Sequence, residues 1–233
     1  MRISDNIRHI LFDLDNTLWD FSGNSKRILA QIYTDMQLSE KGIPGFEQFH
    51  AQYAFRNEYL WQQYGLGNVT RDEVRHNRFY ITLNDFGIDN YALAAAAADY
   101  YIQHTRHQKD LLPHTISLLE YAVQKYKLHI ITNGFDEVQF FKLENTGIRK
   151  YFDTVTTAEN ARSLKPNKQI FDHAIATIHT APEHCLYIGD SPEADGQGAT
   201  KAGMDFIWFN PNGKENVYGF KEVGSLEEIM GMI

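Results

Sequence analysis

The chain lacks several features that mark other classes of protein. Its 233 residues contain one cysteine, Cys185, so no intrachain disulfide can form, and a reducing compartment fits. No Lys/Arg-rich run occurs and the formal net charge is −8, which argues against binding to nucleic-acid polymers or anionic membranes. No stretch approaches 18 consecutive apolar residues, and the apolar run near the N-terminus is too short for a signal peptide. These absences predict a globular, cytoplasmic protein with no nucleic-acid or membrane partner.

Short apolar runs that end in polar residues or glycine indicate β-strands. They lie at 9–14, 127–131, 185–188 and 205–209. Segments between the later runs have helical spacing, with faces formed by Leu118, Leu119, Ala122 and Val123, and by Ile170, Phe171, Ala174, Ile175 and Ile178. Strands that alternate with helices predict an α/β fold with a doubly wound, mainly parallel sheet. Such a sheet binds its ligand at the carboxyl ends of its strands.

The stretch from about 22 to 108 shows no strand pattern. Helical patterns cover roughly 22–38, 46–66, 70–87 and 90–107. We therefore expect an inserted all-α cap domain at 21–108, and a catalytic core made of 1–20 and 109–233.

Asp13 and Asp15 follow the first predicted strand. Side chains at i and i+2 point the same way while the chain is extended. Two carboxylates this close repel each other unless a cation neutralises them, and Mg²⁺ prefers oxygen ligands. A solvated acidic turn is the simpler alternative for an isolated D-x-D pattern, but the preceding hydrophobic strand favours a site.

Two further segments offer groups that bind phosphate. Thr132, Asn133 and Gly134 end the second predicted strand and precede a helix near residue 136, so a hydroxyl and free N–H groups are available. Lys165 precedes a proline, which favours an extended conformation from which the ammonium can reach inward. In isolation, the first segment also fits an ordinary turn before a helix, and the lysine also fits a solvated position.

Asp190 follows the third predicted strand, at a position suited to a metal ligand. Asp195 lies about one helical turn further on, where its carboxylate would support the metal ligands without binding the metal itself. The alternative is an N-capping aspartate with acidic neighbours that the helix dipole favours.

Taken together, these motifs resemble those of the haloacid dehalogenase superfamily. The matches are D-x-D-x-T at 13–17, Thr132, Lys165 and G-D-x-x-x-x-D at 189–195. The resemblance implies a Rossmann-like core in which Asp13 is the nucleophile and Asp15 the acid/base. It also implies that Thr132, Lys165 and the backbone of Asn133 and Gly134 bind the phosphoryl group. Mg²⁺ would be held by Asp13, the Asp15 carbonyl and Asp190.

Within that superfamily the chain is most similar to the pyrimidine 5′-nucleotidase group. The similar stretches are 12–21, 60–73, 78–79, 131–135, 142–147, 151–153 and 165–171. One departure is 159–162, where an acidic residue followed by a glycine is expected. The implied substrate is a small phosphate monoester, a pyrimidine nucleoside 5′-monophosphate. Open alternatives are a sugar phosphate, phosphoglycolate or sialic-acid phosphate, or a phosphomutase reaction, while Asp15 and the insert disfavour a phospho-aspartate switch without enzymatic activity.

Four residues are candidates to contact the rest of the substrate. Phe21, Trp61 and Tyr64 could line a pocket, and Trp61 and Tyr64 share a helix face, where a planar base could stack. Arg78 could contact the base or ribose. The alternatives are packing in the core of the cap for the aromatic residues and a solvated or salt-bridged position for Arg78. We expect a monomer or a weak homo-oligomer.

Overall fold

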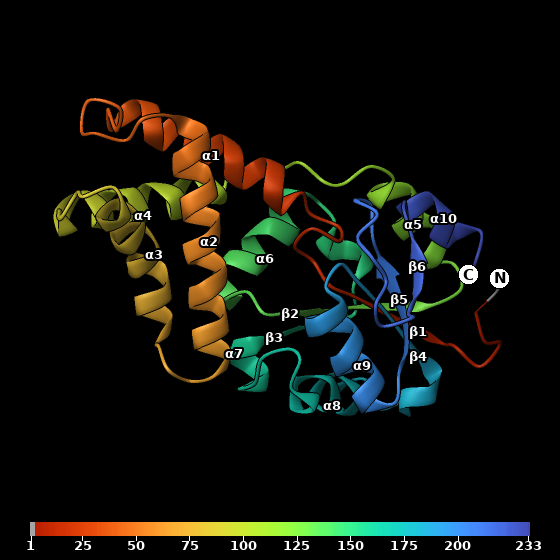
Figure 1. Cartoon of the computed structure of the whole chain (residues 1–233). Coiled ribbons are helices and arrows are strands. Elements are labelled where there is room, and N and C mark those ends of the chain that lie inside the picture. Colours follow the sequence, from red (N-terminus) through yellow and green to blue (C-terminus); the bar gives the residue numbers. More distant parts are fainter. Residues whose placement is uncertain (1–2) are drawn as a thin grey trace. The chain divides into compact units, whose positions relative to one another are not determined.

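The computed structural model describes residues 3–233, which divide into two compact units (Figure 1). The sheet unit contains the chain up to Phe21 together with Lys109–Ile233. The helical unit is Ser22–Gln108. No helix among residues 3–233 has the length and apolar character that crossing a membrane requires.

In the described part of the sheet unit, six parallel strands form one sheet in the order β3-β2-β1-β4-β5-β6. They are β1 (His9–Phe12), β2 (Lys127–Thr132), β3 (Thr154–Thr157), β4 (Cys185–Gly189), β5 (Asp205–Phe209) and β6 (Lys221–Val223). The predicted doubly wound parallel sheet is confirmed. The sequence patterns missed β3 and β6, because β3 consists of three threonines and a valine and β6 has only three residues.

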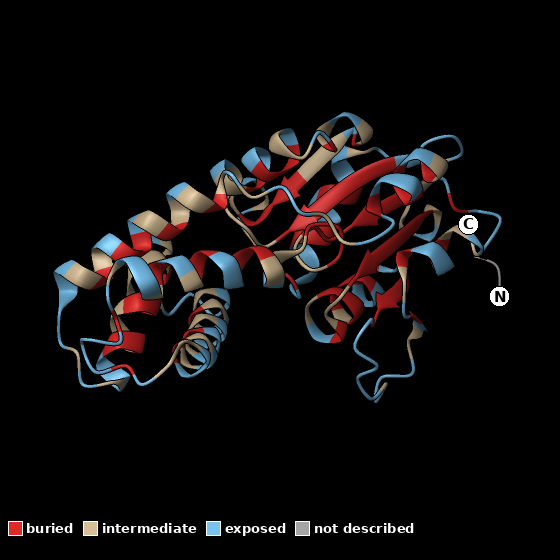
Figure 2. Ribbon diagram, turned by 90° about the horizontal axis from the view of Figure 1, so that it is seen from above, coloured by how far each residue is buried: buried red, intermediate tan, exposed pale blue. Residues whose placement is uncertain are grey.

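Alternate residues of the strands enter two separate cores, one on each face of the sheet. Ile10 and Phe12 pack into the core with α5 (Thr115–Ala122) and α10 (Leu226–Met230). Leu11 packs into the core with α8 (Lys168–Thr177) and α9 (Gln197–Ala202). Figure 2 shows the central strands almost entirely buried, as expected for parallel strands covered by helices. The other helices of this unit are α6 (Asp136–Asn145) and α7 (Ala158–Ala161), the 3₁₀ helices η1 (Arg149–Tyr151) and η2 (Pro182–His184), and the short π-helix η3 (Pro192–Gly196).

The predicted helix faces hold with one exception. Ile178 follows the end of α8 and still packs against the core. The assignment of Val123 to the buried face was wrong, because α5 ends at Ala122 and the Val123 side chain is exposed. Helix α5 therefore ends one residue before the last apolar residue of the pattern.

Four helices form the helical unit: α1 (Phe21–Asp35, which starts one residue before the unit), α2 (Phe46–Gly65), α3 (Arg71–Asp85) and α4 (Tyr91–Thr105). Thr70 and Glu73 form a reciprocal capping box that starts α3. The Asn90 side chain caps α4. Aromatic side chains from three helices meet in the core of the unit, where the Tyr53 ring lies 4.8 Å from Phe79 and 5.9 Å from Tyr101.

The order of the strands determines where a ligand can enter the sheet unit. The chain runs from β1 outward through β2 and β3 on one side, and then through β4, β5 and β6 on the other. The connections after β1 and β4 therefore run in opposite directions, and open α/β sheets bind ligands at the carboxyl ends of such a pair of strands.

Candidate active site

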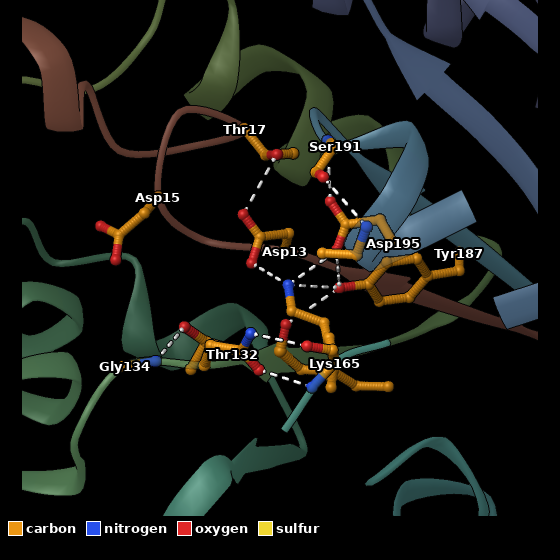
Figure 3. A network of polar contacts seen from close by, with 12 residues as sticks. Asp13, Asp15, Thr17, Thr132, Gly134, Lys165, Tyr187, Ser191 and Asp195 are labelled. Carbon is orange, nitrogen blue, oxygen red and sulfur yellow. Dashed lines mark hydrogen bonds and ion pairs between the residues drawn. The ribbon is translucent and has the colours of Figure 1, made fainter. Parts of the chain in front are cut away.

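Asp13 directly follows β1, and its backbone N–H donates to the Ile188 carbonyl oxygen at 2.9 Å. Lys165 arrives from the loop between α7 and α8, and its ammonium donates to Asp13 Oδ1 at 2.5 Å. The same ammonium donates to Asp195 Oδ1 at 2.7 Å and to the Tyr187 hydroxyl at 3.1 Å. Figure 3 shows this network around the Lys165 ammonium. All three N–H donors of Lys165 thus have acceptors, which fixes its position.

Burial dominates the electrostatics of this network. It raises the pKa of Asp13 to about 7, although the positive charge of Lys165 acts in the opposite direction. Burial alone lowers the pKa of Lys165, but the charges of Asp13 and Asp195 outweigh it, so the net shift is upward. The pKa of Asp190 is also raised, by burial first and then by the charges of Asp13 and Asp195. The single positive charge of Lys165 does not neutralise the carboxylates of Asp13, Asp190 and Asp195, so a further cation would stabilise the site.

The carboxylates of Asp13, Asp190 and Asp195 each offer an oxygen within 4.8 Å of the others. The Asp195 oxygens are already used: Oδ1 accepts from Lys165 and Tyr187, and Oδ2 accepts from the Ser191 N–H at 3.0 Å. A side chain on Gly189 would collide with the Asp195 carboxylate, so this position needs glycine. Among the described residues, Asp13 and Asp190 therefore keep oxygens for a metal ion, and Asp195 supports them from behind. Oxygen donors of this kind fit Mg²⁺.

The Asp15 side chain does not point the same way as that of Asp13, contrary to the expectation for extended residues at i and i+2. The chain leaves the strand after Phe12 and turns, and Asn16 has a φ of 60°. Figure 3 shows the Asp13 carboxylate directed at Lys165, whereas the Asp15 carboxylate points away from that network. Asp15 instead accepts from Lys142 Nζ at 2.5 Å and from Gln139 Nε2 at 3.0 Å. Each carboxylate thus has a lysine of its own.

Thr132 ends β2, and its hydroxyl oxygen accepts from the Gly134 N–H at 3.2 Å and from Gln139 Nε2 at 2.5 Å. Because two donors occupy this oxygen, the hydroxyl proton is left to donate to another group. Asn133 ties the Lys165 loop to β2: its side-chain oxygen accepts from the Lys165 N–H at 2.7 Å and its amide donates to the Lys165 carbonyl at 3.1 Å. The Asn133 side chain is therefore used in positioning Lys165.

The loop before Lys165 lacks the expected glycine, but its backbone still makes a left-handed turn at Arg162. Arg162 ends α7 with φ 50° and ψ 36°, the left-handed conformation that glycine adopts without steric cost. The Glu159 carboxylate accepts from the Asp136 N–H at 2.7 Å, at the start of α6. An arginine thus makes the turn that carries the chain to Lys165.

The remaining predicted contact residues lie in different surroundings. The Phe21 ring lies 6.3 Å from the Trp19 ring and 5.6 Å from Lys142 Nζ. Trp61 and Tyr64 meet edge to face at 5.8 Å in the helical unit. Arg78 is buried, so a solvated position is wrong, and it makes no ion pair with a described residue.

Two residues of α6 were missed by sequence reasoning. Gln139 and Lys142 are 0% and 4% exposed, and both contact Asp15. The available signal was their spacing of three residues beside the apolar Leu143, which places polar side chains on the buried face of a helix. Tyr187 was also missed, because a tyrosine inside a buried strand looks like ordinary core.

Comparison with known proteins identifies a family whose members are similar to this chain. Residues 10–209 match the family model for haloacid dehalogenase-like hydrolases. The chain belongs to this family. It is 32% identical over 226 residues to the HAD-hydrolase YfnB of Bacillus subtilis, covering 95% of this chain and 93% of YfnB. A crystal structure of YfnB bound to magnesium has a TM-score of 0.87 at 30% identity and covers 97% of both chains.

Two further family members have named activities. The pyrimidine 5′-nucleotidase YjjG of Escherichia coli is 32% identical over 224 residues, which cover 94% of this chain and 95% of YjjG. The pyrimidine 5′-nucleotidase PynA of Streptococcus pneumoniae is 30% identical over 211 residues, which cover 90% of this chain and 86% of PynA. The family thus supports hydrolase chemistry for this chain.

Proposed function

We propose that this family member is a magnesium-dependent phosphatase that hydrolyses pyrimidine nucleoside 5′-monophosphates through an aspartyl-phosphate. The observation that carries the proposal is the buried Asp13 carboxylate, held by Lys165 beside Asp190 and at the edge where Thr132 presents its hydroxyl. The two nucleotidases similar to the chain over most of its length support the nucleotide as substrate.

The residues of the sheet unit have distinct roles in this proposal. Lys165 holds Asp13 Oδ1, so Oδ2, whose described partner is the Thr17 hydroxyl at 3.4 Å, attacks phosphorus. Thr132 donates its hydroxyl proton to a phosphoryl oxygen, and the positive charge of Lys165 stabilises the charge that develops there. Lys165 is thereby shared between the nucleophile and the phosphoryl group.

Asp15 then moves the protons. It protonates the departing alkoxide of the nucleoside, and afterwards takes a proton from the water that hydrolyses the aspartyl-phosphate. This sequence returns Asp13 and Asp15 to their starting states.

The metal ion completes the charge balance. Asp13, Asp190 and the Asp15 carbonyl would hold Mg²⁺, and the bound ion supplies positive charge that offsets carboxylate and phosphoryl oxygens. This role agrees with the excess of buried negative charge at Asp13, Asp190 and Asp195.

The helical unit has the role of a cap in this proposal. Trp61, Tyr64 and Arg78 supply contacts to the nucleoside, by stacking on the base and by donating hydrogen bonds to its oxygens. The sheet unit then determines the chemistry and the helical unit the choice of substrate.

The test is release of free phosphate in the presence of Mg²⁺ or EDTA. The panel contains dUMP, dTMP, UMP, AMP, phosphoglycolate, several sugar phosphates and a sialic-acid phosphate. We expect turnover that requires the metal and is fastest with the pyrimidine monophosphates. Asp190→Asn is expected to raise the Mg²⁺ concentration needed for half-maximal activity, whereas the same change at exposed Asp172 is not. Preference for another ester would refute the substrate, and release of phosphate only with a bisphosphate activator would indicate a mutase.

A further inference from the structure

Helix α6 buries two polar side chains beside the active-site loop. Gln139 and Lys142 are 0% and 4% exposed, at positions where an amphipathic helix normally places apolar residues. Lysine is almost never this buried unless it is paired. The burial of these two side chains therefore requires compensating interactions.

The surroundings of Lys142 hold its ammonium in one place. It lies 2.5 Å from Asp15 Oδ1, 4.3 Å from the centre of the Trp19 ring and 5.6 Å from the centre of the Phe21 ring. The two rings replace water on the sides that the carboxylate does not cover. Trp19 and Phe21 belong to the same segment as Asp15, so Lys142 ties this segment to α6.

Gln139 holds the other oxygen of the same carboxylate. Its Nε2 lies 3.0 Å from Asp15 Oδ2 and 2.5 Å from Thr132 Oγ1. Gln139 and Lys142 are three residues apart on one face of α6, which brings them to the two oxygens of one carboxylate. Gly134 permits this arrangement, because a Cβ there would collide with the Gln139 side chain.

We infer that Gln139 and Lys142 are positioning residues for Asp15, an inference that rests on the proposed role of Asp15 as acid/base. With both oxygens held, the carboxylate keeps one orientation relative to the loop that carries Asp13. The same Gln139 amide occupies a lone pair of Thr132, so that the hydroxyl proton is directed to the phosphoryl group. Helix α6 thereby sets the proton-transfer group and the phosphoryl-binding hydroxyl together.

A double-mutant cycle tests whether Lys142 acts through Asp15. The measured quantities are kcat and KM for p-nitrophenyl phosphate with Mg²⁺, and the thermal midpoint of each variant. The variants are Lys142→Met, Lys142→Arg, Asp15→Asn and the Asp15→Asn/Lys142→Met double variant. The control is Lys168→Met, which removes an exposed lysine paired with Asp172.

Lys142→Met is expected to lower kcat by about 10- to 100-fold with KM changed by less than about twofold, since misplaced proton-transfer groups cost factors of this size. Lys142→Arg restores most of the loss because it keeps the charge. In the Asp15→Asn background, Lys142→Met has no further effect, because the group that it positions is gone. Lys168→Met behaves as the wild type.

An equal loss of kcat in the Asp15→Asn background, or a loss confined to KM, would overturn the inference. If Lys142→Met does not fold, Lys142→Leu is judged by the same cycle and the same criteria. Absence of phosphate release by the wild type would instead refute the proposed function, whereas an active wild type with an unaffected Lys142→Met variant would refute the positioning role alone.

Discussion

The two units bury charge in opposite ways. The sheet unit buries the ammonium of Lys165 against the carboxylates of Asp13 and Asp195, at 2.5 and 2.7 Å. It also buries the ammonium of Lys142, which pairs with the partly exposed carboxylate of Asp15 at 2.5 Å. In the described part of the helical unit, the buried charged side chain is Arg78, which is surrounded by aromatic rings. Buried charges are costly unless they are paired. The sheet unit therefore maintains a preorganised charge network, whereas the core of the helical unit consists of aliphatic and aromatic side chains.

This contrast predicts different consequences of substitution. Changes at the strand ends of the sheet unit should alter turnover more than stability. Changes in the helical unit should alter stability or apparent affinity, with turnover preserved.

The largest effect is expected for Asp13→Asn. The amide cannot attack phosphorus, so phosphate release should fall by at least about 10³-fold, as for loss of other nucleophiles. The fold should remain, because the amide has almost the same shape and can still accept from Lys165. Phosphate release and thermal unfolding of the same preparation check both points. A folded variant with substantial turnover would refute the covalent mechanism.

The next largest effect is a dependence of stability on pH, which arises from His129 in the core of the sheet unit, away from the carboxyl ends of the strands. His129 contacts His9 at 3.0 Å and Thr154 at 2.9 Å. Burial first, and then the charge of His9, lower the pKa of His129 from 6.5 to about 4. Because the folded protein favours neutral His129, its contribution to stability is complete above pH 6.5 and is lost as the pH falls toward 4.

The free energy of unfolding should fall by about 3 kcal/mol at most, because this is the free energy that corresponds to such a pKa shift. Chemical unfolding of the wild type between pH 7 and 4 measures it. His129→Gln should flatten this dependence, while His173→Gln, which changes an exposed histidine, should not. Equal slopes for the wild type and His129→Gln would contradict the assignment.

Arg78→Met tests the helical unit. The guanidinium lies 4.6 Å from the centre of the Tyr101 ring and 3.3 Å from Asn57 Oδ1, while its Nε has no hydrogen-bond partner among residues 3–233. Methionine fills similar space without the charge, so the unit should stay folded. If Arg78 contacts the nucleoside as proposed, KM for the pyrimidine monophosphate should rise by about tenfold, about 1.4 kcal/mol, with kcat preserved.

The control for this variant is Arg75→Met. Arg75 pairs with Asp99 at 3.6 Å and is partly exposed, so its loss should leave KM unchanged. An unchanged KM for Arg78→Met, together with a shifted thermal midpoint, would assign Arg78 to the core of the helical unit alone.

The smallest effect is expected at Arg162. Glycine removes the steric cost of the left-handed conformation, so Arg162→Gly should stabilise the protein by about 0.5–1 kcal/mol. Arg162→Ala keeps the Cβ and should bring no such gain. Chemical unfolding compares the two variants, and a gain for alanine equal to that for glycine would show that the side chain, not the backbone, is responsible.

Much of the site was predictable because its residues occupy strand ends. In a parallel sheet, the residues that follow β1, β2 and β4 meet at one edge, so Asp13, Thr132 and Asp190 could be grouped from the strand pattern alone. The relation of Asp15 to Asp13 was not predictable, because it depends on the turn after β1. A period of two residues predicts direction only while the chain remains extended.

The sequence by itself determined the parallel α/β class, the helical insert and the set of groups available for chemistry. These follow from local periodicity and from residue types at element ends, which are properties of neighbouring residues. Only the tertiary structure decided which cation each carboxylate meets: Lys165 for Asp13 and Lys142 for Asp15. Such pairs join residues more than 100 positions apart, and their choice depends on how α6 and the α7–α8 loop pack beside the first strand.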